Sequence, residues 1–209
     1  MEIEKVSRKL LNRLPVYLQY IKTLPNETVN ISATQMARAL GLGDVLVRKD
    51  LAKVSNGGRR KLGYVREGLI QDIEEYLNVS STATAIIAGA GKLGQALLDY
   101  VGFEKSGLHI LAGFDIGAMK KTESGKPIYP ISRLPEFCET HAVAIGIITV
   151  PAEYAQEVCD QLVACGIKGI WNFSPVHLYV PEDVEIQTEN LAVSLTALRM
   201  QLKNRDKRK

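Results

Sequence analysis

The sequence predicts an α/β fold with two domains, in which a small helical domain precedes a larger domain built on a parallel sheet. From residue 84 onward, short apolar runs alternate with segments of helical periodicity, as in parallel sheets with crossover helices. Charge divides the chain similarly: residues 1–66 hold 13 Lys and Arg against 5 Asp and Glu, whereas residues 67–198 hold 7 against 17. A basic front on an acidic domain indicates that the front binds a polyanion.

Three helices are predicted in the basic front. Leucines at helical spacing predict the first over residues 4–24, with Pro15 either kinking it or marking its start. Ser32 and Gln35 form a capping box that opens a second helix over residues 33–40. After a glycine-containing turn, a third helix over residues 45–53 completes a helix-turn-helix, whose second helix enters the DNA major groove.

Residues 55–65 predict a β-hairpin, because a Gly-Gly turn lies beside three cations and a Gly-Tyr-Val run follows. Such a hairpin is the wing of a winged helix-turn-helix domain, which we place at residues 1–78, with a short helix over residues 67–77 at its end. The alternative interpretation is that these cations form a solvated face of an interaction domain. Cations on the second helix and the wing suit contact with DNA. The predicted DNA-binding residues are Val47, Arg48, Lys49, Lys53, Arg59, Arg60 and Lys61.

The larger domain begins with a candidate nucleotide-binding turn. The apolar run at residues 84–88 enters Gly89-x-Gly91-x-x-Gly94, and a helical pattern follows. Gly89 permits a tight turn, Gly91 lets backbone approach a pyrophosphate, and Gly94 lets the helix and strand pack closely. A glycine-rich turn without a ligand is the alternative, but the strand before and the helix after it favour dinucleotide binding.

Asp115 ends the next apolar run, 21 residues beyond Gly94. A carboxylate at that distance is placed to bind the ribose hydroxyls of a dinucleotide. Because it would repel a 2′-phosphate, Asp115 favours NAD over NADP. Lys120 and Lys121 favour a phosphate instead, but we expect them on a solvated loop.

Two further apolar runs predict buried parallel strands at residues 142–150 and 167–173, joined by a helix over residues 152–164. These elements predict a Rossmann-like parallel-sheet domain at residues 79–188. Ligands of open α/β sheets bind at the carboxyl ends of the strands. The predicted cofactor-binding residues are therefore Gly89, Ala90, Gly91, Lys92, Leu93, Gly94, Asp115, Ile116, Thr149, Val150, Pro151, Asn172, Phe173 and Ser174.

Four leucines predict a final amphipathic helix within residues 189–209, packed either on its own sheet or on a partner subunit: Leu191, Leu195, Leu198 and Leu202. No apolar run is long enough to span a membrane, and the N-terminus lacks the apolar region of a signal peptide. The three cysteines lack metal-ligand spacing and suit core positions in a reducing compartment. We therefore expect a cytoplasmic protein with no metal site and no membrane contact.

Taken together, these motifs resemble the redox-sensing transcriptional repressors of the Rex family over nearly the whole chain. The most specific stretch is Gly166-Ile-Lys-Gly-Ile-Trp-Asn-Phe173. The other matching stretches are Arg13-Leu-Pro-Val-Tyr-Leu18, Val47-Arg-Lys-Asp-Leu51, Gly63-Tyr64, Gly89 to Gly94, Tyr100-x-Gly-Phe103, Phe114-Asp115, Thr149-Val-Pro-Ala152 and Leu178-x-Val-Pro181.

The resemblance implies a homodimer whose C-terminal helix is domain-swapped between subunits. It further implies a repressor that binds inverted-repeat operators in double-stranded DNA and releases them when NADH accumulates, while NAD⁺ leaves the DNA-bound form intact. An apolar pocket at Val150, Pro151 and Phe173 would accept the neutral nicotinamide of NADH more readily than the cationic ring of NAD⁺, because desolvating a cation is costly. We therefore predict tighter binding of NADH.

Two departures from the Rex pattern bear on this expectation. Asn190 stands where relatives commonly carry Asp, in a switch contact with an arginine and a tyrosine that match Arg13 and Tyr100. Asn190 can hydrogen-bond to Arg13 but cannot form an ion pair. Leu46 stands where relatives usually carry Gln, and a leucine cannot make the bidentate adenine contact that is open to Gln.

Two other functions are alternatives. An NAD-dependent oxidoreductase needs a general acid or base near the nicotinamide. His109 and His141 precede strands, at the wrong end of the sheet, and His177 has no carboxylate at useful spacing. We therefore expect no enzyme activity. A regulator that senses another nucleotide, such as CoA, is the second alternative, because the same glycine turn can hold a CoA diphosphate.

Overall fold

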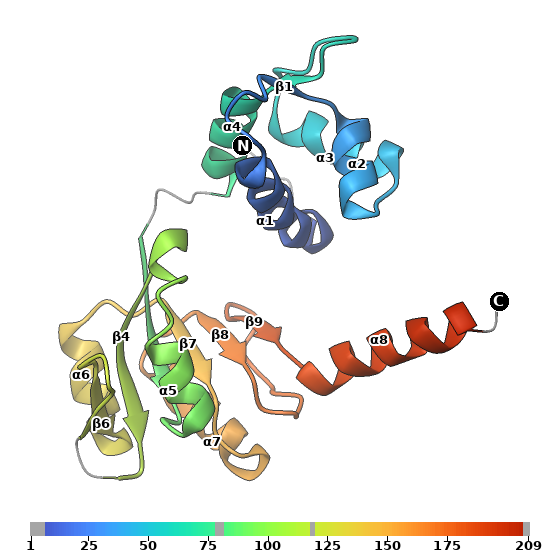
Figure 1. Cartoon of the computed structure of the whole chain (residues 1–209). Helices are drawn as coiled ribbons and strands as arrows, with labels where there is room; N and C mark the ends of the chain where they lie inside the picture. Colours follow the sequence, from blue (N-terminus) through green and yellow to red (C-terminus); the bar gives the residue numbers. More distant parts are fainter. Residues whose placement is uncertain (1–6, 78–81, 118–119, 207–209) are drawn as a thin grey trace. The chain divides into compact units, whose positions relative to one another are not determined.

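The computed structural model describes residues 7–77, 82–117 and 120–206, which form two compact units. One unit lies within residues 1–81 and the other within residues 82–209. Figure 1 shows helices and a small hairpin in the first unit, and a sheet flanked by helices in the second.

The first unit has the elements of a winged helix-turn-helix. They are α1 (Arg8–Thr23), β1 (Asn30–Ile31), α2 (Ala33–Leu40), α3 (Asp44–Val54), β2 (Tyr64–Val65) and α4 (Arg66–Tyr76). The predicted capping box is confirmed, because Gln35 N donates to Ser32 Oγ over 3.1 Å and Ser32 N donates to Gln35 Oε1 over 2.8 Å. Pro15 lies inside α1, so the helix does not start there; residues 4–6 of the predicted helix lie outside the described residues.

The predicted hairpin is present, but its turn lies elsewhere. Arg59 and Gly63 exchange two backbone hydrogen bonds of 2.8 and 2.9 Å, so the chain reverses over residues 60–62 rather than at Gly57 and Gly58. β2 then pairs antiparallel with β1. Gly63 has a φ of +78°, and a Cβ there would lie 2.4 Å from the carbonyl oxygen of Ile31. The close passage of the hairpin over β1 therefore requires glycine at position 63.

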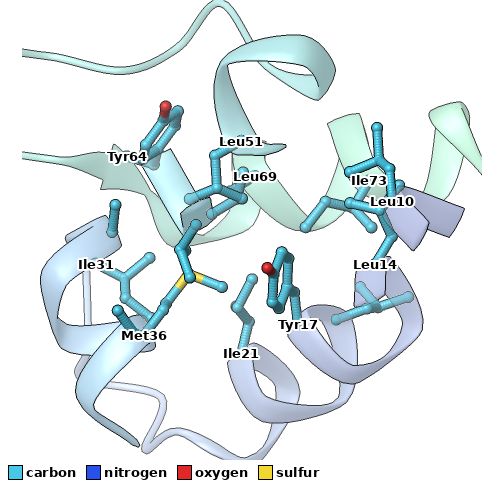
Figure 2. Close-up of a cluster of buried hydrophobic side chains, with 14 residues drawn as sticks. Leu10, Leu14, Tyr17, Ile21, Ile31, Met36, Leu51, Tyr64, Leu69 and Ile73 are labelled. Carbon is cyan, nitrogen blue, oxygen red and sulfur yellow. The ribbon is translucent and has the colours of Figure 1, made fainter. Parts of the chain in front are cut away.

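An apolar core holds the helices of the first unit together (Figure 2). Tyr17 and Ile21 from α1 join the same cluster as Leu51 from α3 and Leu69 and Ile73 from α4, and all five are essentially inaccessible to solvent. This packing fixes which face of α3 points inward, and hence which face it presents to solvent.

The second unit is built on a seven-stranded sheet. Its elements are β3 (Ala83–Ala88), α5 (Lys92–Leu98), η1 (Glu104–Ser106), β4 (Leu108–Asp115), β5 (Lys120–Lys121), β6 (Pro127–Pro130), η2 (Ile131–Arg133), α6 (Leu134–Thr140), β7 (Ile145–Ile148), α7 (Ala152–Ala164), β8 (Gly169–Asn172), β9 (Glu185–Thr188) and α8 (Leu191–Asp206). The strand order is β5-β6-β4-β3-β7-β8-β9, and β5 pairs antiparallel with its neighbour, whereas the other six strands are parallel.

This topology confirms a Rossmann-like domain. Counted along the chain, the six parallel strands lie in the order 3-2-1-4-5-6, which is the doubly wound order of dinucleotide-binding sheets. Side chains of α5 pack in one apolar cluster of the sheet, and those of α6 and α7 pack in another. α7 has the predicted bounds, whereas β7 and β8 are shorter than the apolar runs at residues 142–150 and 167–173.

The cysteines take the core positions expected of them. Cys159 is buried in α7, and Cys138 and Cys165 are half-buried. Burial raises the pKa of the Cys159 thiol to about 11, so little reactive thiolate forms near neutral pH.

Candidate nucleotide site and nucleic-acid interface

The glycine-rich turn lies where the strand order reverses, at the carboxyl end of β3 beside β7. Gly89 has a φ of +98°, and a Cβ there would lie 2.8 Å from Val150 Cγ1. A Cβ at Gly94 would lie 1.9 Å from the Gly89 carbonyl oxygen. Packing therefore requires glycine at positions 89 and 94. At Gly91, by contrast, a Cβ would meet no atom within 4 Å, so this glycine borders open space.

Asp115 ends β4 beside this turn, as predicted. Its Oδ2 accepts a hydrogen bond from Ala90 N, and its Oδ1 accepts one from Ile116 N, each over 2.7 Å. Asp115 also lines a pocket of about 220 Å³. A carboxylate at this place can accept hydrogen bonds from the hydroxyl groups of a ribose, and the adjoining pocket can hold the attached base. The pocket is lined by Ala90, Gln95, Asp115, Ile116, Gly117, Lys120 and Ile128.

Lys120 and Lys121 are exposed to solvent as expected, but they form the short strand β5 and not a loop. Lys120 pairs with Ile128 of β6, and it lines the same pocket as Asp115. The pocket is therefore lined by one anionic and one cationic residue.

The end of β7 supplies the other side of the turn. Thr149 Oγ1 donates to the Gly89 carbonyl oxygen over 2.6 Å, which ties the two strand ends together. Val150 and Phe173 are half-buried and Pro151 is exposed, so this edge of the sheet offers apolar surface to a ligand. Lys92 and Leu93 are exposed in the first turn of α5.

Two of the predicted cofactor-binding residues have side chains that are buried and hydrogen-bonded within the protein. Asn172 is 0% exposed; its Oδ1 accepts from Ser174 N over 2.8 Å, and its Nδ2 donates to the carbonyl oxygens of Ser174 and Val176 over 3.1 and 3.0 Å. Ser174 Oγ donates to the Val150 carbonyl oxygen over 2.5 Å. Because these side chains are buried and already bonded, they hold the loop after β8 in place.

A basic surface lies on α3 and the hairpin. Lys49 and Lys53 are exposed on α3, where Arg48 is also exposed. Arg59, Arg60 and Lys61 are exposed in and beside the hairpin turn. The prediction for Val47 was wrong: its side chain is 0% exposed and belongs to the core, one turn before Leu51. We call the surface formed by the six cationic residues the basic face.

Arg13, a predicted switch residue, has a partner that the sequence did not indicate. Its Nε and Nη2 donate to the two carboxylate oxygens of Asp50 over 2.6 and 2.8 Å, and Tyr17 Oη donates to the same carboxylate over 2.8 Å. Asp50 is 5% exposed, on the inward face of α3. The hydrogen bonds with Asp50 raise the pKa of Arg13, and burial with the bond to Asp50 raises the pKa of Tyr17 to about 12.

The other two switch residues lie in the second unit. Asn190 immediately precedes α8, and its Oδ1 accepts from Val193 N over 3.1 Å, so its side chain acts as a helix cap. Tyr100 is 56% exposed and packs edge-on against Phe103, with ring centroids 5.0 Å apart. Residues far apart in the sequence continue this aromatic row, because Phe103 contacts Trp171, which contacts Phe173.

α8 carries exposed apolar residues on two opposite faces. Leu191, Leu195, Leu198 and Leu202 are each more than half exposed, and so are Val193 and Met200 on the opposite face. The predicted leucine row is therefore present, but the helix is not polar on its other side. A helix that is apolar on both sides is normally buried between other elements.

Within the described ranges, no helix is both long and apolar enough to cross a bilayer. The same ranges contain no cluster of three or more His, Cys, Asp or Glu residues that could hold a metal ion.

Two family models match the chain. Residues 5–52 match a model described as a putative DNA-binding protein N-terminus, and residues 80–176 match one described as a CoA binding domain.

Curated relatives and solved structures match nearly the whole chain. A redox-sensing transcriptional repressor Rex from Porphyromonas gingivalis is 38% identical over 96% of this chain and 93% of its own length. The Rex of Brevibacillus brevis is 37% identical over 93% of this chain and 96% of its own. The Rex-family repressor RSP in complex with β-NAD⁺ and operator DNA is 33% identical, with a TM-score of 0.88 over 96% of this chain and 94% of its own. RSP in complex with β-NADH is 32% identical, with a TM-score of 0.88 over 97% of this chain and 96% of its own. This chain belongs to the Rex family of redox-sensing transcriptional repressors.

Proposed function

We propose that this protein represses transcription by binding an inverted-repeat operator through its basic face, and that NADH bound at the glycine-rich turn releases the DNA. The observation that carries the proposal is the open space at Gly91, at the switch point of the sheet and beside the Asp115 carboxylate. The same chain carries the basic face on its helix-turn-helix unit. A ligand site and a DNA-binding surface in one chain are what a ligand-controlled repressor needs.

A gel shift on an inverted-repeat operator tests this proposal. The full chain is titrated onto the duplex at fixed salt, because phosphate contacts make the affinity strongly salt-dependent. NADH or NAD⁺ is then added to the complex. We expect NADH to release the operator at concentrations at which NAD⁺ does not. Release by both, or by neither, would contradict the proposed sensing of NADH.

We predict that NADH binds at least about tenfold more tightly than NAD⁺, a difference of about 1.4 kcal/mol. Val150, Pro151 and Phe173 offer apolar surface where the nicotinamide would lie, and such surface accepts a neutral ring at lower cost than a cationic one. Calorimetry with each nucleotide measures both affinities. Equal affinities would show that the ring does not enter this apolar surface.

The nucleotide specificity depends on Asp115 and Lys120. We propose that the carboxylate, held by Ala90 N and Ile116 N, binds the ribose hydroxyls and disfavours a 2′-phosphate. Lys120 on the pocket wall favours a phosphate, and the match to the CoA binding domain model makes CoA the second candidate ligand. Thermal shift with NADH, NADPH and CoA separates these ligands: we expect stabilisation by NADH alone, and a shift with CoA alone would favour the second candidate.

We propose that the protein acts as a regulator without catalysis. His109 lies near the amino end of β4, away from the carboxyl ends where a nicotinamide would bind. His141 stacks on Phe137, with ring centroids 4.0 Å apart, and His177 packs edge-on against Tyr179. His177 follows the carboxyl end of β8, but among the described residues no carboxylate is hydrogen-bonded to it, so it lacks the partner that a general acid or base of this kind commonly has. Loss of NADH absorbance with candidate carbonyl substrates would contradict this proposal.

We propose that this protein is a cytoplasmic homodimer in which the two chains exchange their α8 helices. The exposed faces of α8 carry the support: the leucine row at residues 191, 195, 198 and 202, and the opposite pair Val193 and Met200. Burying both faces needs elements on both sides of the helix, which a second copy inserted against it supplies.

The double variant Leu195→Lys, Leu198→Lys should be a monomer. It should bind the operator at least about tenfold more weakly, because a monomer contacts one half-site only. Sedimentation velocity and gel shifts measure the two effects. Gln201→Lys, an exposed change on the same helix, is the matched control and should leave a dimer. A double variant that stays dimeric would rule out α8 as the interface.

A further inference from the structure

An apolar pair interrupts the cationic surface at the start of α3. Val45 is 63% exposed and Leu46 is 40% exposed, in the first turn after the helix begins at Asp44. The inward face of the helix is already filled by Val47, Asp50 and Leu51. The core of this unit therefore does not account for the two exposed side chains.

Cationic residues follow this pair along α3. Arg48 extends from the next turn, and its Nη2 donates to Asp44 Oδ2 over 2.6 Å. Asp44 Oδ1 in turn accepts from Thr34 Oγ1 over 2.7 Å, which joins the start of α3 to α2. Lys49 and Lys53 are exposed farther along α3. The charge around the pair matches a phosphate-lined groove and disfavours an apolar protein surface.

The first residues of a recognition helix are the ones that reach base edges in the major groove. Leucine and valine side chains have no hydrogen-bond donor or acceptor, so they cannot read the polar groups of adenine, guanine or cytosine. The one apolar group that a base pair presents in the major groove is the C5-methyl of thymine. The chemistry of the pair therefore selects one base.

We propose that Leu46 and Val45 are specificity-determining residues that recognise thymine in each operator half-site through its methyl group. This inference rests on the proposed binding of DNA by α3. The operator of this protein carries thymine opposite the start of α3, and burial of the methyl group against the pair contributes to affinity at that position. Arg48, held by Asp44, and the lysines of α3 contact the backbone on either side.

Removing single methyl groups from the DNA tests the inference. A binding site is first selected with the full chain from a pool of random-sequence duplexes, and each thymine is then replaced by deoxyuridine, which lacks only the methyl group. We expect about a fourfold loss of affinity for each methyl group that the pair buries, at one or two positions per half-site. Uniform affinity across all single replacements would overturn the proposal.

Protein variants assign the effect to the pair. In Leu46→Ala and Val45→Ala, affinity for the thymine operator should fall, and the difference between thymine and deoxyuridine should shrink or vanish. Lys53→Ala should weaken both duplexes equally, because a phosphate contact carries no base information. Val29→Ala, which changes an exposed apolar residue outside α3, should keep the full difference. An unchanged difference in both variants of the pair would overturn the proposal.

These outcomes separate the inference from the proposed function. If the pool yields no bound duplex at any practical salt concentration, DNA binding itself fails, and with it the inference. If duplexes are selected but none loses affinity when a thymine methyl group is removed, the protein binds DNA, but Val45 and Leu46 do not recognise thymine.

Discussion

Gly91→Val should make the operator complex insensitive to NADH. Gly91 is the one glycine of the turn whose Cβ would meet no protein atom, and its φ of −71° suits any residue. The fold therefore accepts valine there, and the added methyl groups occupy the space that a pyrophosphate needs. We expect at least about a hundredfold loss of NADH affinity, equivalent to about 2.7 kcal/mol, with operator affinity close to that of the unmodified chain.

Two further glycine variants separate a loss of NADH binding from a loss of folding. Gly91→Ala adds one carbon and should give an intermediate loss, whereas Gly94→Ala places a Cβ 1.9 Å from the Gly89 carbonyl oxygen and should destabilise the unit. Calorimetry with NADH, gel shifts and thermal unfolding measure the three properties. If the Gly91→Val variant has the unfolding temperature of the unmodified chain and still releases DNA with NADH, the nucleotide site lies elsewhere.

Asp50→Ala should strongly destabilise the helical unit. Asp50 accepts two hydrogen bonds from Arg13 and one from Tyr17, and its removal leaves an arginine that is only 23% exposed without a partner. Breaking a buried ion pair costs about 3 to 5 kcal/mol, and we expect about 3 because Arg13 keeps some contact with water. Operator binding should weaken as well, because Asp50 joins α3 to α1.

Two milder variants are the controls for Asp50→Ala. Tyr17→Phe removes a single hydrogen bond and should cost about 1 kcal/mol. Asp44→Ala breaks the exposed pair with Arg48 on the same helix and should cost less than about 1 kcal/mol. Urea unfolding followed by far-ultraviolet circular dichroism reports both units, whereas fluorescence of Trp171 reports the second unit alone. Equal costs for Asp50→Ala and Asp44→Ala would contradict the buried network.

The chemistry of Asp50 also shows a signal that was available in the sequence. An acid between Val47 and Leu51 lies on the inward face of a helix and therefore needs a partner there. Arg13 and Tyr17, four residues apart on one face of α1, offer one cation and one hydroxyl group. The resemblance to the Rex family implies a switch contact between Arg13 and Asn190. In the structure, Asn190 caps α8, and Arg13 is bound within its own unit.

Local patterns in the sequence determined the α/β class, the capping box, the bounds of α7 and the glycine-rich turn, because periodicity, caps and turn residues act over a few neighbouring positions. Only the tertiary structure decided which of the predicted residues are buried and which line a pocket. Asn172 and Ser174 are buried supports, Val47 belongs to the core, and Lys120 lines the pocket beside Asp115. The physical reason is distance along the chain: partners such as Arg13 and Asp50, 37 residues apart, meet only when separate helices pack.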